Sequence, residues 1–134
     1  MTIRLLPPLL LCALPLANAQ DDAPSAQTLC ARHTDALLGA LDEAQYDAAT
    51  TDFDAALRTR YTVARLRLDY EALPVKLGKA MGSGRPHIAE TGGHPVVMTP
   101  LIFERGTVTA EVHCDADGAI SDLRLAVTQS MAAP

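Results

Sequence analysis

Residues 95–127 constrain the fold of this chain more than any other stretch, because apolar and polar positions alternate there between two compact turns. The alternation predicts three antiparallel strands: Val96–Glu104, Thr107–Cys114 and Ala119–Val127. Arg105-Gly106 predicts a two-residue hairpin connection, and the segment 115–118, which ends in Gly118, predicts a slightly longer turn. The stretch therefore predicts a contiguous antiparallel meander.

Because side chains alternate across a strand, the turn positions decide which residues share a face. A hairpin centred on Arg105-Gly106 places Leu101 opposite Ala110 and Val97 opposite Cys114. A second turn centred between Ala116 and Asp117 places Ala110 opposite Leu123. One face is then apolar along its length, and we expect the helices to pack there. The other face is interpreted as a solvated surface, with a ligand or partner surface as the alternative; it carries Thr107, Thr109, Glu111, His113, Asp122 and Arg124.

Three amphipathic helices are expected before the meander. Ser25 is a suitable N-cap for a helix over 26–41, and a second helix is expected over about 46–60. Apolar positions spaced three and four apart predict a third helix over 63–81, with a kink or break at Pro74 and Gly82 as the C-terminal signal. Gly82–Gly84 is expected to be a flexible linker, followed by a short strand over Arg85–Thr91 and a turn at Gly92-Gly93. Helices first and then an antiparallel sheet indicate the α+β class.

The N-terminus indicates an exported protein. One basic residue, Arg4, precedes a short apolar run that ends in Ala17-Asn18-Ala19, which is typical of a signal peptide covering residues 1–19. We expect residues 20–25 to form a flexible lead-in, 26–128 a single domain and 129–134 a flexible tail. No later apolar segment approaches the length of a membrane span, and the location is predicted to be periplasmic or secreted. The net charge of −5 without a basic cluster argues against nucleic acid as a partner.

Two cysteines remain after the predicted signal peptide. Cys30 lies on the apolar stripe of the first helix, and Cys114 lies on the apolar face of the meander. An even number of cysteines in an oxidising compartment favours a disulfide, whereas two separate buried thiols are the alternative. Since both side chains are expected to point into the same layer, we predict a helix-to-sheet disulfide.

The pattern of helical and turn residues resembles a known bacterial family. The pieces are Leu41, Tyr46, Phe53-Asp54, Leu57, Leu66, Tyr70, Leu73 and Gly78, then 100–106 and 115–123. On these residues the chain resembles the family called domain of unknown function 3887. The resemblance implies a nuclear-transport-factor-2-like or cystatin-like roll, with helices against a curved antiparallel sheet. This family usually has Trp where this chain has Tyr70, and it implies no activity.

No catalytic motif is present, so the sequence favours a non-catalytic accessory or binding module without a cofactor. Its partner is expected to be an unknown protein or a small apolar ligand of the cell envelope. The alternative is a small periplasmic enzyme of the isomerase or dehydratase type that uses a pocket between helices and sheet. Candidate pocket residues are His33, Tyr70 and Glu90. For His33, which lies on an apolar helix stripe, a hydrogen-bonded core histidine is the preferred interpretation.

A third hypothesis concerns soft-metal binding on the outward face. If Gly92-Gly93 closes a two-residue hairpin, His87 lies opposite Met98, and the next predicted hairpin places Met98 opposite His113. Imidazole and thioether groups suit an ion such as Cu(I). A chance row of surface residues is the competing explanation, and it is the preferred one.

Overall fold

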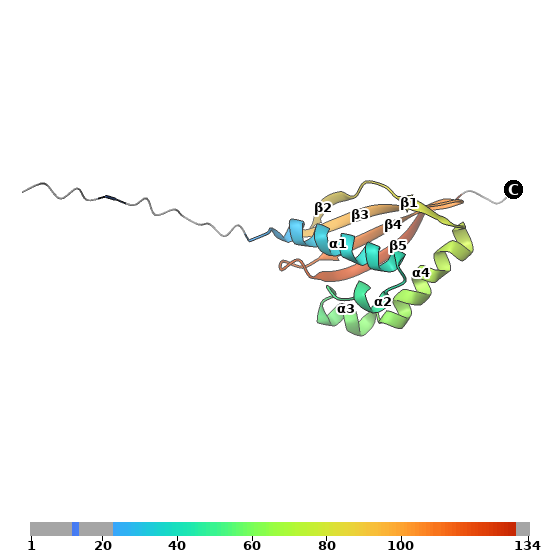
Figure 1. Cartoon of the computed structure of the whole chain (residues 1–134), viewed down its shortest axis with the longest axis horizontal. Helices are drawn as coiled ribbons and strands as arrows, with labels where there is room; N and C mark the ends of the chain where they lie inside the picture. The colour runs from blue at the N-terminus through green and yellow to red at the C-terminus, as the bar shows by residue number, and fades with distance from the viewer. Residues whose placement is uncertain (1–11, 14–22, 131–134) are drawn as a thin grey trace, which may run out of the picture.

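A computed structural model describes residues 12–13 and 23–130, with side chains through residue 128. The fold is α+β, with four helices followed by an antiparallel five-stranded sheet (Figure 1). The helices are α1 (Ala26–Asp42), α2 (Tyr46–Ala49), α3 (Ala55–Arg60) and α4 (Val63–Leu77). The strands are β1 (Ala80–Ser83), β2 (His87–Thr91), β3 (His94–Phe103), β4 (Gly106–Cys114) and β5 (Ile120–Ser130). The α+β class predicted from the sequence is confirmed.

Helix α1 begins and packs as its sequence pattern predicts. The side chain of Ser25 accepts a hydrogen bond from the backbone amide of Thr28, which satisfies one of the free amides of the first turn. The buried stripe of α1 comprises Cys30, Thr34, Leu37 and Leu41. Thr34 is polar, but its hydroxyl donates to the carbonyl of Cys30 one turn earlier, so its burial leaves no unpaired donor.

The expected second helix over 46–60 is wrong, because the structure divides it into α2 and α3. Between them, Phe53 is buried and forms a parallel bridge with Ile120 of β5. The amide of Asp54 donates to the carbonyl of Ile120, and the Asp54 carboxylate caps α3 by accepting from the amide of Leu57. A continuous helix would lose these sheet contacts and the cap, so tertiary pairing decides the break.

Helix α4 continues through Pro74 and ends at Leu77, earlier than the expected end at Met81. The C-cap is Gly78 at φ +80°, not Gly82. The positive φ favours glycine at this position, whereas the atom nearest to a Cβ there, a carboxylate oxygen of Glu104 at 2.8 Å, is the end of a flexible side chain that could move aside. The expected linker Gly82–Gly84 is also corrected, since its first two residues belong to β1.

Strand β3 is the central strand of the sheet, with β4 on one side and both β1 and β2 on the other. The order is β1-β3-β4-β5, and β2 also pairs with β3, so that β1 and β2 follow each other along one edge. Strand β5 forms the opposite edge. Helix α1 packs against β3 and β4, whereas α3 contacts β5, and the helices lie over one face (Figure 1).

The predicted register of the meander is wrong by two residues at both hairpins. Leu101 pairs with Val108 rather than Ala110, because the first turn is formed by Glu104-Arg105. This turn is held by the end of α4, where the amide of Arg105 donates to the carbonyl of Leu77. At the second hairpin Ala110 pairs with Leu125 rather than Leu123. A shift of two residues keeps every side chain on its face, so the apolar and polar faces are still as predicted.

Cys30 and Cys114 form a disulfide that joins α1 to β4, which confirms the predicted bridge. Both residues are almost completely buried and belong to the main apolar cluster. The predicted signal peptide lies outside the described residues except for Cys12 and its neighbour. Across the described ranges, none of the helices combines the length and apolar character that crossing a bilayer requires.

Candidate functional site

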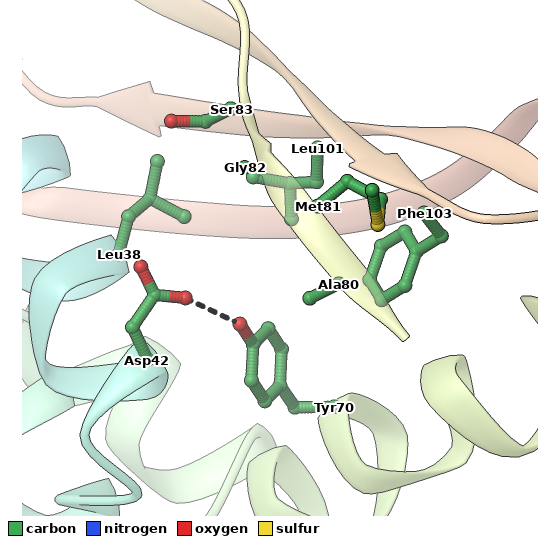
Figure 2. A pocket seen from close by; sticks show the side chains of 9 residues that line it. All are labelled: Leu38, Asp42, Tyr70, Ala80, Met81, Gly82, Ser83, Leu101 and Phe103. Carbon is green, nitrogen blue, oxygen red and sulfur yellow. Dashed lines mark hydrogen bonds between the residues drawn. The ribbon is translucent and has the colours of Figure 1, made fainter. Parts of the chain in front are cut away.

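The principal candidate site is a cavity of about 390 Å³ between the end of α1, the middle of α4 and the edge strand β1. Figure 2 shows its lining side chains, which come from elements far apart in the sequence. They are Leu38, Asp42, Tyr70, Ala80, Met81, Gly82, Ser83, Leu101 and Phe103. The cavity therefore forms where the end of α1, the middle of α4 and the strands β1 and β3 come together.

Two polar side chains meet at this cavity. The hydroxyl of Tyr70 donates a hydrogen bond to Oδ1 of Asp42 over 2.9 Å (Figure 2). Partial burial, and then this hydrogen bond, raise the pKa of Tyr70 well above its ordinary value of 10.0. The phenol therefore stays protonated at neutral pH and acts as a donor, while Oδ2 of Asp42 has no partner among the described residues.

The other side chains of the wall are apolar except for Ser83, and polar and apolar atoms contribute about equally to the cavity surface. Leu101 and Phe103 project from β3 and form the floor, and Leu38 closes the side formed by α1 (Figure 2). Met81 of β1 is 64% exposed, although it lines the cavity, so its flexible thioether stands at the opening. Apolar side chains beside a convergent polar pair are a common feature of small-molecule sites.

Of the three residues predicted to lie in a pocket, only Tyr70 lines this cavity. Glu90, expected to point inward, is exposed on β2, where it accepts a hydrogen bond from the side-chain amide of Gln27 over 3.0 Å. Because β2 is an edge strand, residues on both of its faces are largely exposed, including Glu90 beside the start of α1. The isomerase or dehydratase hypothesis depended on Glu90 and His33, and neither lies in the cavity.

His33 lies instead in the first half of α1, beside the turn that joins β4 to β5. Its Nδ1 is 2.6 Å from the carbonyl of Gly118, which can only accept, so Nδ1 carries a proton and donates. Its Nε2 is 3.6 Å from Oδ1 of Asp52. The ring thus ties α1 to the β4–β5 turn and to the segment between α2 and α3.

The row expected for soft-metal binding is not formed. His87 pairs with Met98 as predicted, but Met98 pairs with Glu111, and His113 lies opposite Val96. The two-residue shift of the first hairpin moves His113 away from Met98. The Nε2 atom of His113 forms a hydrogen bond with the carboxylate of Glu111. In the part of the chain that the structure describes, no three His, Cys, Asp or Glu side chains are grouped so that they could hold a metal ion.

Asp42 is the functional candidate that sequence reasoning missed. It lies at the end of α1, just past the predicted end of the first helix at residue 41, and nothing in its sequence neighbourhood indicates a partner. Its contact with Tyr70 spans 28 residues and depends on how α4 packs beside α1. The only signal in the sequence for this pair is an aspartate at a helix end together with an aromatic residue on another helix.

Comparison with known proteins identifies no relative, since the chain matches no family model, no curated protein and no solved structure.

Proposed function

We propose that this chain is an exported, non-catalytic binding module and that the cavity between α1, α4 and β1 is its ligand site. The single observation that carries this proposal is the pairing of Tyr70 with Asp42 at a cavity whose other side chains are mostly apolar. The disulfide between Cys30 and Cys114 supports export, because such bonds persist in oxidising compartments. Together with the N-terminal signal pattern, it supports a periplasmic or secreted location.

The geometry favours a small ligand with an apolar body and a hydrogen-bond donor. The apolar body would lie against Leu101 and Phe103, and the donor would reach the free Oδ2 of Asp42. A protonated amine fits best, because a charge-assisted hydrogen bond to a carboxylate is about twice as strong as a neutral one. Tyr70 would position the carboxylate through its own hydrogen bond to Oδ1.

We also propose that the chain is a divergent member of the domain of unknown function 3887 family with a cystatin-like roll. This proposal is supported by the α+β order of elements and by the packing of helices on one face of an antiparallel sheet. Tyr70, at the position where that family usually has Trp, is half-buried and has the hydroxyl partner that a phenol in such a place requires.

The ligand proposal is tested with 2-phenylethylamine as the probe and phenylacetate as its anionic counterpart. Titration is followed by amide chemical shifts in nuclear magnetic resonance spectra. We expect the amine to perturb Leu38, Tyr70 and Met81 with a dissociation constant on the order of 1 mM, as for a fragment. Phenylacetate should not perturb them, because its carboxylate would face the Asp42 carboxylate.

Asp42→Asn should weaken binding of the amine by about tenfold, since it removes the charge that the ammonium group contacts. The matched control is Asp69→Asn, because Asp69 accepts from Tyr61 in an equivalent pair that lies outside this cavity. If the amine binds elsewhere, or if both variants lose affinity equally, the cavity is not the site. Equal binding of phenylacetate would reject the role of the carboxylate.

A further inference from the structure

We propose that the cavity between α1, α4 and β1 binds the amino terminus of a peptide whose first side chain is apolar, and that the second peptide residue pairs with the main chain of Ser83. This inference rests on the proposed function and names the class of ligand for the same site. Three features carry it: an oxygen of Asp42 without a partner, a helix end without a cation, and a strand edge without a neighbour.

The end of α1 at the cavity is acidic and lacks a balancing cation. Asp42 is the last residue of α1 and Glu43 is its C-cap, and the last turn contains no basic residue. The helix macrodipole adds partial negative charge at this end. Among the described residues, neither acid belongs to an ion pair, and no Lys or Arg lines the cavity. A positively charged ligand group would therefore complement this end of the helix.

The main chain of β1 forms the opposite side of the cavity. All four residues of this strand line it, and Figure 2 shows Asp42 on one side and β1 on the other. Gly82 has no side chain, so it lines the cavity through main-chain atoms alone. The cavity surface is about as polar as apolar, which suits a ligand that carries main-chain amide and carbonyl groups as well as an apolar side chain.

The pairing of β1 shows which of its main-chain groups are free. The amide of Gly84 donates to the carbonyl of Pro100, and Gly82 pairs with Ile102, so both glycines direct their hydrogen-bonding groups toward β3. Alternate residues of an antiparallel strand face opposite edges, so the amide and carbonyl of Ser83 face away from β3. In the described chain β3 is the sole neighbouring strand of β1. Ser83 therefore presents one donor and one acceptor at an open edge beside the cavity.

The apolar side chains of the cavity provide a place for the first peptide side chain. Leu101 and Phe103 form the floor, and Leu38 closes one side. Met81 stands at the opening, where its flexible thioether can adapt to side chains of different shape. The volume of about 390 Å³ is small for a ligand site, so it suits a terminal residue rather than a long segment.

A peptide amino terminus uses all of these groups at once. Its ammonium group would bind Oδ2 of Asp42, its first side chain would lie on Leu101 and Phe103, and its second residue would exchange hydrogen bonds with Ser83. Successive residues of an extended chain are about 3.3 Å apart, so these contacts fall within one small cavity. Capture of a terminal amine and addition of a strand are both established modes of peptide recognition. A simple amine would leave the main chain of Ser83 unpaired.

The ligand class is tested with the tripeptide phenylalanyl-alanyl-alanine amide, which is titrated into protein expressed from its full-length sequence and recovered after export. The tripeptide should bind about tenfold more tightly than 2-phenylethylamine, because two main-chain hydrogen bonds add to the contacts of the amine. Acetylation of its amino terminus should weaken binding by roughly 100-fold, since acetylation removes the charge that the carboxylate of Asp42 contacts and adds bulk at that point.

The pairing with Ser83 is tested by N-methylation of single peptide amides. Methylation at the second residue removes the donor to the carbonyl of Ser83 and should return the affinity to that of 2-phenylethylamine. Methylation at the third residue is the matched control, because that amide faces the opposite edge of an extended peptide and should leave the affinity unchanged. At saturation, hydrogen exchange at the amide of Ser83 should slow by about tenfold, whereas exchange at Gly82, whose amide faces β3, should not change.

The outcomes separate this inference from the proposed amine site. If 2-phenylethylamine binds in the cavity but the tripeptide binds no more tightly, or if both methylated peptides bind equally, the peptide inference is overturned and the amine site stands. Equal affinity of the acetylated tripeptide also overturns it, because the peptide would then bind without its terminal charge. If neither the amine nor the tripeptide perturbs the cavity, both proposals fail together.

Discussion

Reduction of the disulfide should remove a large part of the stability of this fold. Cys30 and Cys114 are 84 residues apart, so the bridge closes a loop over most of the domain. The chain-entropy relation for a loop of this length gives about 4.5 kcal/mol at 25 °C, because the reduced unfolded chain regains the freedom that the bridge had removed. A domain of this size has a free energy of unfolding of about 5–15 kcal/mol, so the reduced protein should be marginally stable.

This loss in the free energy of unfolding corresponds to a measurable fall in Tm. The entropy of unfolding is about 2.1 cal/mol/K per residue, and the ordered domain runs from Ala26 to Ser130. Dividing the expected loss of free energy by the entropy of unfolding of the whole domain predicts a fall in Tm of about 20 °C. The assay is urea unfolding and thermal unfolding of the oxidised protein and of the Cys30→Ala/Cys114→Ala variant, followed by circular dichroism.

Oxidised protein treated with a phosphine reductant is the control for lost packing, since reduction keeps both sulfur atoms in the core. Reduced protein and the alanine variant should lose similar stability, with the variant slightly lower because it also lacks two buried sulfur atoms. The urea m-value should rise in both, because an unfolded chain without the bridge exposes more surface. A loss below about 1 kcal/mol, with both thiols shown to be free by alkylation, would refute the entropic reasoning.

Two further predictions concern single side chains. Gly118→Ala should lower the free energy of unfolding in urea by about 2–4 kcal/mol, because Gly118 has φ +80° and a Cβ there would lie 2.5 Å from Cβ of Leu29. Gly39→Ala in α1 has no atom within 4 Å and should instead raise it by about 0.5–1 kcal/mol; a loss at position 39 as large as that at 118 would contradict the steric explanation. Burial raises the pKa of Tyr61 and Tyr70 above the unfolded value of 10.0, so their contribution is complete below about pH 10 and is lost as pH rises further. Urea unfolding from about pH 9 to about pH 11 should therefore show falling stability, with a shallower fall for Tyr70→Phe; an unchanged slope would show that Tyr70 is not the group responsible.

The sequence correctly predicted the faces of the meander but not its pairing. Leu101, Val108 and Val112 lie on the buried face as expected, because alternation has a period of two and any even shift preserves it. The first turn lies one residue earlier than the strong Arg105-Gly106 signal suggests. Backbone hydrogen bonds from Arg105 to Leu77 at the end of α4 and from Glu104 to Lys79 just after it favour that position, and these contacts are not visible in local sequence.

The same distinction explains the outcome at the candidate sites. Tyr70 was named as a candidate pocket residue from the sequence, whereas its partner Asp42 requires knowledge of how two helices pack. The soft-metal row depended on the predicted register, so the shift of two residues separated Met98 from His113. A residue on a correctly predicted face can thus have an incorrectly predicted neighbour.

The sequence by itself determined the α+β class, the buried face of each main strand and the disulfide between Cys30 and Cys114. These features follow from periodicity and side-chain parity, which are properties of consecutive residues. Only the tertiary structure decided the break between α2 and α3, the end of α4 at Gly78 and the cavity at Tyr70. Those features depend on long-range hydrogen bonds and close approaches between segments, and their free energies outweigh local helix and turn preferences.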